Sequence, residues 1–596
     1  MAAASPGGGS TATAVVPSRA WTRKNRRVEP SGVRASTRSA ARGSKPAQGA
    51  SRRIMLTRSF PIVSLQGYDT TSQQRTAPAH PHHPANAMSP TERFRNSLLD
   101  PSEFTITYEL VPGQGSGGKQ IERLLDFAAR ARDDGRIKAL SITDNAGGHP
   151  ALAPVAIGSD VQKIGIEPLI HFSLKDKNRN QVKSHIFLYQ RQGFHSLLVL
   201  GGDYPRSDYY GQAKPVFDLD SIQTLRMMRA MEEGRGLSPA HEQAAELPPY
   251  RFLRGCVVSP FKATEAEQVW QYARLLRKVR AGASFIVTQL GYDMCKFEEL
   301  IRFLRQENIT IPVLANVFIP SLSVARLMAR GGVPGIIFPD PLIRAMEEEA
   351  AANDRRARLV RAARMIAVLR GLGYDGVHIG GNCLDFDDIR LVMDLAEEIG
   401  EQWPQHRDTI HFPAGPSWYL YGEPSGTACA TTPQPLAPGR RPGGLALHRF
   451  MHRLLFSRQT LTGRLFGRLC LRLGATRGSG LLRLVERVSK EVLFACRMCG
   501  DCTLAESTYL CPQSGCPKKL TNGPCGGSRN MACEVHPERR CFWVRVYDRL
   551  DPATTIHELG HGPVLPPKDW SLDQSSSWFN YFSGRDHTTR TKDFLE

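Results

Sequence analysis

The sequence predicts an α/β protein: a TIM-type (βα)8 barrel, followed by a helical linker and a small cysteine-rich metal-binding domain. Three observations predict this class. Eight short apolar, β-branched runs alternate with longer amphipathic segments between residues 104 and 400. A stretch rich in Pro, Gly and Thr then leads into an Arg-rich helical pattern. Finally, eight of the 13 cysteines lie between Cys496 and Cys541.

Residues 1–87 have the composition of a disordered basic tail. They hold thirteen Lys and Arg against Glu29 and Asp69, without apolar periodicity. Such a segment cannot bury enough apolar surface to order itself. An organelle-targeting segment, or a start read from too far upstream of Met88, is the alternative.

The barrel is predicted over residues 88–403. Its eight strands are expected at Phe104–Leu110, Ala139–Thr143, Pro168–Phe172, Ser196–Leu200, Gly255–Val258, Phe285–Gln289, Pro312–Phe318 and Gly376–Ile379. Between them apolar residues recur at helical spacing, as at Ile121, Leu124 and Ala128. Strands that alternate with helices form a parallel sheet, and eight such units match a closed barrel. A doubly wound open sheet is the competing architecture.

Four segments are predicted after the barrel: a linker over 404–445, an Arg-rich helical segment over 446–493, the eight-cysteine domain over 494–550, and a C-terminal tail over 551–596. The helical segment carries Leu447, Phe450 and Leu454 on one side and arginines on the other. A basic face for an acidic protein partner is one interpretation, and a solvated face of helices packed on the barrel is the other.

The net charge of +20 does not indicate nucleic-acid binding, because the charge is concentrated in two segments. Residues 1–87 and 440–490 are each net +11, so the rest of the chain is close to neutral. Binding to a phosphate backbone needs cations on the folded body. The sequence contains no uncharged apolar run of about 18 residues, so no membrane span is predicted.

Polar residues stand at the carboxyl ends of the predicted strands, where a barrel carries its active site. They are Glu109, Thr143, Asp144, His171, Gly202, Asp203, Ser259, Gln289 and Asn382. A barrel interior is otherwise filled by branched apolar residues, so these residues are informative as a set. Each alone has an ordinary explanation, such as a helix cap or a turn.

Five of these strand ends resemble methylenetetrahydrofolate reductases in order and spacing. They read Thr-Tyr-Glu109-Leu-Val-Pro, Ser-Ile-Thr143-Asp, Leu-Ile-His171-Phe, Leu-Gly-Gly-Asp203 and Val-Thr-Gln289, and Lys278 stands eleven residues before Gln289. The resemblance spans about residues 104–400. It implies a flavin-binding barrel that passes a hydride from a reduced nicotinamide, through the flavin, to 5,10-methylenetetrahydrofolate, giving 5-methyltetrahydrofolate.

The resemblance also implies roles for single residues. Glu109 is the expected acid. Limited access of water at the mouth of the barrel is expected to raise its pKa, so that it can protonate the folate ring as the ring opens. Asp203 is the expected carboxylate near the flavin and the cationic iminium, and Gln289 is expected to hydrogen-bond the pterin. Flavin contacts are expected from Thr143, His171, Gly202, Asp203 and Lys278.

Two departures from the family pattern concern the flavin. Val-Val-Ser259-Pro-Phe-Lys262 stands where well-studied members carry an aromatic residue and a histidine for the adenine half of FAD. Gly201 stands where an Arg often precedes Gly-Asp. FAD is the first expectation, with FMN or a loosely held flavin as the alternative.

The clustered cysteines predict metal ligation. The expected ligands are Cys496, Cys499, Cys502, Cys511, Cys516, Cys525, Cys533 and Cys541. Thiolates at such spacing suit two four-cysteine sites, holding either [4Fe–4S] clusters or zinc. Around Asn522-Gly-Pro-Cys525-Gly-Gly-Ser, this stretch resembles the cysteine-rich C-terminal domain fused to, or encoded beside, reductases of this family.

These patterns together predict a folate-dependent oxidoreductase whose electron donor is NAD(P)H or a reduced carrier such as ferredoxin. A dense cysteine cluster in a large chain favours a reducing compartment, and a cytoplasmic location is expected. The alternative is a non-catalytic iron–sulfur electron-transfer or docking subunit of a folate or methyl-transfer complex, in which the barrel is a retained scaffold. The presence of Glu109, Asp203 and Gln289 together favours the enzyme.

Overall fold

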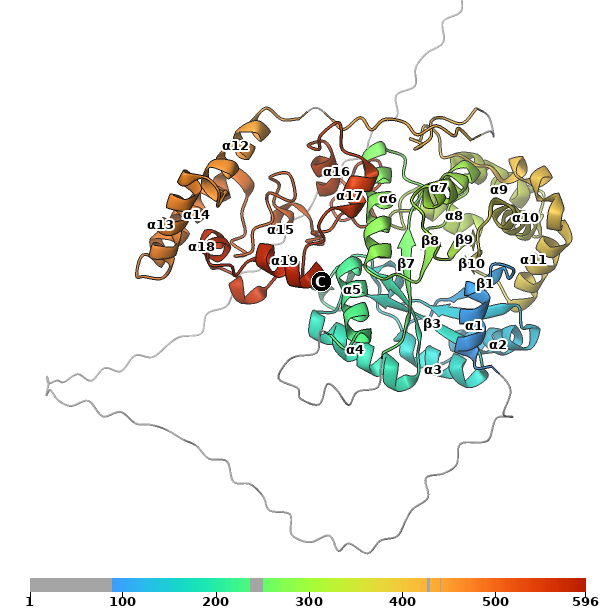
Figure 1. Ribbon diagram of the computed structural model, residues 1–596. Helices are drawn as coiled ribbons and strands as arrows, with labels where there is room; N and C mark the ends of the chain where they lie inside the picture. The colour runs from blue at the N-terminus through green and yellow to red at the C-terminus, as the bar shows by residue number, and fades with distance from the viewer. Residues whose placement is uncertain (1–87, 236–249, 426–428, 440, 596) are drawn as a thin grey trace, which may run out of the picture. The chain divides into compact units, whose positions relative to one another are not determined.

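Eight parallel strands close into a barrel enclosed by helices (Figure 1). The computed structural model describes residues 88–235, 250–425, 429–439 and 441–595, so the predicted tail over 1–87 lies outside the described residues. The barrel strands are β1 (Thr105–Leu110), β2 (Ile137–Ile142), β3 (Glu167–Ser173), β4 (Ser196–Leu200), β7 (Leu253–Val258), β8 (Phe285–Thr288), β9 (Val313–Ile319) and β10 (Gly376–Gly381). They follow chain order around the barrel, and β1 pairs with both β2 and β10. The predicted closed barrel is confirmed.

Ten helices accompany these strands in the described part of the barrel region. They are α2 (Lys119–Asp134), α3 (Pro154–Ile164), α4 (Arg179–Gln192), α5 (Ser221–Glu232), α6 (Glu265–Arg280), α7 (Met294–Gln306), α8 (Leu322–Ala329), α9 (Asp340–Ala351), α10 (Ala357–Leu372) and α11 (Phe386–Ile399). A two-stranded hairpin follows β4, formed by β5 (Ser207–Asp208) and β6 (Gly211–Gln212), which the sequence did not predict.

Helix α1 (Pro90–Leu99) closes the amino-terminal end of the barrel. Ser89 and Glu92 form a capping box that starts the helix. Phe94 and Leu98 are buried in the same apolar cluster as inward residues of the strands, including Phe285, whose ring lies 6.2 Å from that of Phe94. Because this end is filled by apolar side chains, any site in the barrel must lie towards the other end.

The segment after α11 contains little regular structure. It holds the short 3-10 helices η3 (Gly400–His406) and η4 (Asp408–Ile410). A disulfide joins Cys429 in this segment to Cys295 at the start of α7, with Cα atoms 5.5 Å apart. The sequence did not predict this bond, because the two cysteines are 134 residues apart and no spacing pattern marks them.

The C-terminal third is helical around the cysteines. Its helices are α12 (Gly444–Phe456), α13 (Leu461–Gly474), α14 (Ser479–Phe494), α15 (Pro512–Gly515), α16 (Phe542–Tyr547), α17 (Ile556–His561), α18 (Ser577–Phe582) and α19 (His587–Leu595). In α16, Trp543 accepts a hydrogen bond at its backbone oxygen from the Trp270 indole of α6, at 3.0 Å. Among the described residues, no helix combines the length and apolar character that crossing a bilayer requires.

Candidate functional site

Three titratable side chains meet inside the barrel towards its carboxyl end: Glu109 from β1, His171 from β3 and His378 from β10. Their closest ligating atoms all lie within 4.8 Å of one another, and Glu109 Oε2 is 3.7 Å from His378 Nε2. Side chains alternate along a strand, so Thr107 also faces the interior, where its hydroxyl lies 2.9 Å from His378 Nδ1. Ser141 Oγ lies 3.0 Å from His171 Nε2 in the same way.

His378 is a residue that the sequence reasoning missed. The signal was available, because His378 stands two residues before Gly380 and so faces the interior from the eighth strand. Reading only the terminal residues of each strand overlooked this inward position.

The pKa of Glu109 is lowered, whereas the sequence analysis expected it to be raised. Burial raises the pKa of this carboxyl, but the ion-pair contact with His378 and the charge of His171 outweigh burial, and the net shift is downward. Burial also lowers the pKa of His171 to about 4. Glu109 is therefore an anion at neutral pH.

The pKa of Asp203, the carboxylate expected near the flavin, shifts in the opposite direction and is raised. Burial raises its pKa, and Glu534 adds to the rise, while the charge of Lys518 and the Gly147 backbone N–H oppose it. The Gly147 N–H donates to Asp203 Oδ2 at 2.9 Å. The pKa of Glu109 is thus lowered where a rise was expected, and the pKa of Asp203 is raised.

Gly202 occupies a position that only glycine fits. Its φ is +83°, and a Cβ there would lie 2.3 Å from Ser173 Oγ. Its carbonyl accepts a hydrogen bond from the Lys518 amine at 2.9 Å. Gly201 differs, because a Cβ on it would meet nothing within 4 Å.

Thr143 and Gln289 lie at strand ends as predicted. Thr143 is buried after β2, where its N–H donates to the Leu110 carbonyl at 3.1 Å. Gln289 follows β8, and its side-chain oxygen accepts the Leu290 N–H at 2.9 Å.

Lys278 does not lie at the mouth. It is in the last turn of α6, and its amine donates to the Val257 carbonyl at 2.5 Å. Burial and the charge of Arg274 lower its pKa to about 8. A helix that follows a barrel strand runs back towards the amino-terminal end, but the Lys278 side chain reaches the penultimate residue of β7. The expected flavin contact of Lys278 stays a prediction.

Three buried polar atoms lack a hydrogen-bond partner within the described ranges and lie on strands or strand ends that lead to the mouth. They are Ser173 Oγ, Ser259 Oγ and Asn316 Oδ1. Buried polar groups are almost always paired in folded proteins. These three are therefore available to hydrogen-bond a polar ligand.

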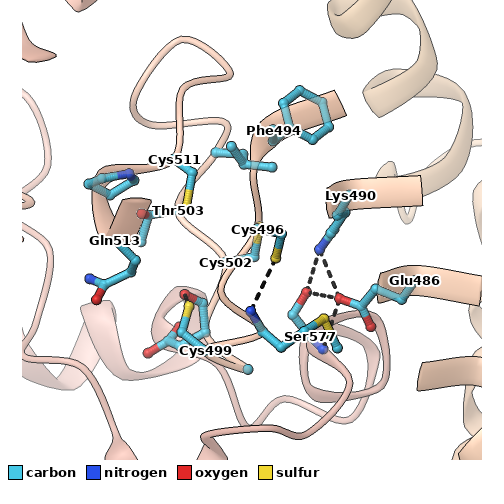
Figure 2. A pocket seen from close by; sticks show the side chains of 15 residues that line it. Glu486, Lys490, Phe494, Cys496, Cys499, Cys502, Thr503, Cys511, Gln513 and Ser577 are labelled. Carbon is cyan, nitrogen blue, oxygen red and sulfur yellow. Dashed lines mark hydrogen bonds and ion pairs between the residues drawn. The ribbon is translucent and has the colours of Figure 1, made fainter. Parts of the chain in front are cut away.

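The eight cysteines divide into two sets in chain order. The first set is Cys496, Cys499, Cys502 and Cys511, which line the pocket drawn in Figure 2. The second set is Cys516, Cys525, Cys533 and Cys541, which line a separate pocket. The sequence alone could not assign the cysteines to sites.

A buried ion pair borders the first set. The Lys490 amine lies 2.9 Å from Glu486 Oε1 and 2.6 Å from Ser577 Oγ (Figure 2). Burial raises the pKa of the Cys499 thiol to about 12. Such thiols ionise when a metal displaces their protons, and Lys490 supplies a positive charge beside them.

Sulfur spacing distinguishes a single ion from a cluster. Three groups of His, Cys, Asp or Glu in the described residues bring three ligating atoms within 4.8 Å of one another, and none of these groups includes a cysteine of either set. A tetrahedral zinc site with Zn–S bonds of about 2.3 Å would hold its four sulfurs about 3.8 Å apart. Within the described residues, no three sulfurs of either set therefore all lie within 4.8 Å of one another.

The second set is fixed directly to the barrel. Lys262, which follows β7 and is fully buried, donates to the carbonyls of Gly526 and Ser528 at 2.5 and 2.6 Å. Arg274 of α6 donates to the Pro524 carbonyl. The residues after β7, noted as a departure from the family pattern, thus hold the loop that contains Cys525.

The Asn-Gly-Pro-Cys stretch contacts the barrel through Asn522 and Gly523. Its buried amide donates to Asp220 Oδ2 and to the Leu565 carbonyl, both at 3.0 Å, and accepts the Leu565 N–H at 2.7 Å. A Cβ on Gly523 would lie 2.6 Å from Arg274. The stretch is therefore specified by its docking on α5 and α6.

Two family models match the chain. Residues 94–380 match the model described as methylenetetrahydrofolate reductase. Residues 479–571 match the one described as methylene-tetrahydrofolate reductase C terminal.

Individual relatives match at low identity. The "Probable methylenetetrahydrofolate reductase (NADPH)" of Caenorhabditis elegans is 22% identical over 227 residues, which cover 37% of this chain and 31% of that protein. The "Methylenetetrahydrofolate reductase (NADH) 1" of Arabidopsis thaliana is 23% identical over 314 residues, 50% of this chain and 49% of that protein. The chain thus spans half or less of these two relatives' lengths.

Among solved structures, a match is described as an uncharacterized protein from Clostridium thermocellum that binds two copies of 5-methyl-5,6,7,8-tetrahydrofolic acid. It is 13% identical, covers 51% of this chain and 98% of that chain, and has a TM-score of 0.36, which is too low to support an inference.

Proposed function

We propose that the chain reduces 5,10-methylenetetrahydrofolate to 5-methyltetrahydrofolate with a bound flavin, in a barrel that matches the methylenetetrahydrofolate reductase model and is fused to a segment that matches its C-terminal model. The observation that carries the proposal is the meeting of Glu109, His171 and His378 inside the barrel. Burying titratable groups costs free energy unless they are used or paired, and a scaffold barrel would fill this space with apolar side chains.

The mouth fits a flavin at its polar atoms. When bound, the flavin supplies hydride transfer to carbon. Ser173, Ser259 and Asn316 offer unpartnered polar atoms for its edge or for the pterin, and Gly202 allows close approach of a ring to the backbone. Lys262 is committed to the cysteine loop, so the adenine half of FAD would be held differently from the well-studied members. FAD is the first candidate and FMN the second.

Glu109 is the proposed proton donor, and His378 is the group that returns a proton to it. Opening the folate ring needs an acid. Glu109 is an anion when water has access to the mouth, but substrate binding expels water and strengthens the contribution of burial, which acts to raise its pKa. The cationic iminium would act on Asp203 in the opposite sense, because a nearby positive charge lowers the pKa of a carboxyl. Substrate binding thus moves both carboxyls towards their proposed roles.

We propose a [4Fe–4S] cluster in each cysteine set, with zinc as the alternative. The wide sulfur spacing supports the clusters. Lys518, two residues after Cys516, donates to Gly202 at the mouth, which puts the second set beside the barrel. Cys511 and Cys516 are five residues apart, so their Cα atoms are at most about 18 Å apart. The two sets therefore form a path for electrons towards the flavin.

Helix α13 offers a surface for an acidic electron-carrier protein. Leu461, Leu465 and Leu469 are 67, 54 and 52% exposed and recur every four residues. Exposed arginines follow the same spacing beside them, at Arg464, Arg468 and Arg472. A second copy of the chain would meet like charges here, whereas an acidic carrier would be attracted. Since α14 leads into Cys496, such a carrier would dock near the first set.

The electron donor in this proposal is a reduced carrier protein, with NAD(P)H as the alternative. NADPH and NADH are the donors in the names of the two relatives. The proposal includes a cytoplasmic location, because the eight thiols of the cysteine domain need a reducing environment for metal binding, although Cys295 and Cys429 form a disulfide.

The proposed reaction is tested by running it backwards, from 5-methyltetrahydrofolate to a dye acceptor. We expect the purified protein to contain flavin and to turn over. Glu109→Gln should lower kcat by roughly 100-fold or more, the usual contribution of a general acid, and should retain its flavin. Glu103→Gln, an exposed carboxyl just before β1, is the matched control and should be unaffected. Equal activity in both variants would exclude the acid role, and a parent protein without flavin or activity would exclude the proposed function.

A further inference from the structure

A cluster of metal-ligating side chains lies apart from the barrel mouth and from both cysteine sets. It consists of Glu307, His557 and His561, whose ligating atoms all lie within 4.8 Å of one another. We propose that this cluster binds a divalent transition-metal ion, with zinc the best fit, and that the ion clamps the C-terminal segment to the barrel. The residues come from chain segments 250 positions apart, so a bound ion would cross-link them.

The two histidines are arranged by the helix that carries them. His557 and His561 are four residues apart on α17, which puts them on one face. Their rings are stacked, with centroids 3.9 Å apart and an interplanar angle of 25°. Two imidazoles from one helical turn are a recurrent pair of zinc ligands.

The third ligand comes from the barrel. Glu307 caps the end of α7, and its Oε2 lies 2.9 Å from His557 Nδ1. The Glu307 side chain is only 14% exposed, so its position is restricted by packing. Two imidazoles and one carboxylate form a set that zinc accepts, leaving one position for water.

Two features fix the geometry before an ion arrives. His561 Nδ1 donates to the His557 carbonyl at 3.0 Å, since a carbonyl can only accept. This bond selects the tautomer whose Nε2 lone pair is available, and ligating histidines are typically oriented in this way. The backbone of α17 is itself held on α6, where Arg277 donates to the Leu559 carbonyl at 2.9 Å and a Cβ on Gly560 would lie 2.3 Å from Leu276.

The segment His557-Glu558-Leu-Gly-His561 also matches the pattern of zinc peptidases, in which the glutamate activates a metal-bound water. Here Glu558 Oε2 accepts the Thr555 backbone N–H at 2.9 Å and forms the capping box that starts α17. A carboxylate engaged at the helix start is not directed at a metal-bound water. The geometry therefore points to a clamp and not to a hydrolase.

The test is the zinc content of the full-length protein, isolated with its cysteine sites as they are. After incubation with Zn²⁺ and removal of the unbound ion, the parent should hold one more zinc per chain than His557→Ala/His561→Ala. Glu307→Gln, which keeps the side-chain size, should weaken this zinc by at least about 10-fold. His185→Ala/His406→Ala changes two histidines outside the cluster and should match the parent.

X-ray absorption of the additional zinc separates this site from the cysteines. We expect nitrogen and oxygen neighbours only. The proposal is overturned if the double variant binds as much zinc as the parent, or if the additional zinc has sulfur neighbours. Flavin and iron contents should be equal in all variants, so this outcome does not depend on the proposed reductase function.

Discussion

At the scale of single residues, His378 controls the charge of Glu109. It supplies an ion-pair contact, with His378 Nε2 3.7 Å from Glu109 Oε2, that lowers the carboxyl's pKa against the effect of burial. The activity of a proton donor falls as the pH rises through its pKa. In His378→Val the lowering contributions are lost, so the pKa of Glu109 should rise and the high-pH limb of kcat/KM should move to higher pH.

The measurement is a pH–rate profile of 5,10-methylenetetrahydrofolate reduction by His378→Val and the parent, with a reduced dye as the electron donor and flavin content recorded for both. His185→Val, which changes a histidine on α4, should leave the profile in place. A limb that stays fixed or moves to lower pH in His378→Val would contradict the proposed role of Glu109.

Gly202 and Gly201 form a matched pair for testing the flavin position. Alanine at 202 adds a Cβ at a positive φ and within 2.3 Å of Ser173 Oγ, which should cost roughly 2 kcal/mol or more of local stability. Alanine at 201 meets nothing within 4 Å. We expect Gly202→Ala to lose most of its bound flavin and Gly201→Ala to retain it, measured as flavin per chain. Equal retention would remove Gly202 from the cofactor site.

The location of the site residues could be predicted from the sequence, but their charge states could not. Glu109, His171 and Asp203 stand at strand ends, and a barrel brings those ends together whatever the packing details. The pKa of Glu109 depends on His378, 269 positions later in the chain, and that of Asp203 depends on Lys518 and Glu534. The contact of Lys278 with the Val257 carbonyl could not be predicted either, because spacing along the sequence does not tell which strand residue a side chain of α6 reaches.

At the scale of elements, Lys518 joins the second cysteine set to the mouth. It is buried, forms an ion pair with Glu534 and donates to the Gly202 carbonyl. Removing one partner of a buried pair leaves an uncompensated charge and is strongly destabilising locally. Lys518→Met should therefore slow carrier-driven reduction of the flavin by at least about 10-fold, while reduction by a small dye is changed less. Lys519→Met, an exposed neighbour, is the control, and equal effects of the two variants would contradict a coupling role for Lys518.

The arginines of α13 give a second prediction at this scale. Arg464→Glu/Arg468→Glu reverses two charges beside the exposed leucines, and steering of a charged partner changes association rates by 10-fold or more. We expect the rate of reduction by an acidic carrier to fall roughly 10-fold at low salt, with dye-driven activity unchanged. Arg123→Glu/Arg191→Glu makes the same charge change on α2 and α4. A similar loss in both pairs would indicate a general charge effect and not a docking surface.

Most elements of the barrel could be predicted because hydrophobic periodicity is a local signal, and all eight strands lie where it indicated. The hairpin of β5 and β6 was missed because its strands have two residues each, too few for any period. The Cys295–Cys429 disulfide and the division of the eight cysteines into two sets could not be predicted from the sequence, since both depend on which segments the fold brings together.

At the scale of the whole molecule, the barrel and the cysteine domain contribute to one site. Lys262, from the barrel, holds the loop around Cys525, and Lys518, from the cysteine domain, binds the backbone of Gly202. The departure from the family pattern after β7 thus coincides with the docking of the cysteine domain on the barrel. This arrangement is the basis for proposing that electrons pass through the cysteines to the flavin.

The most direct test is to mix the purified protein anaerobically with a reduced acidic carrier protein and 5,10-methylenetetrahydrofolate, and to quantify the 5-methyltetrahydrofolate formed. The account predicts product with the parent protein, and loss of carrier-driven product in Cys525→Ser, with flavin retained and dye-driven activity intact. Undiminished carrier-driven product in Cys525→Ser, or no product with the parent despite bound flavin, would contradict it.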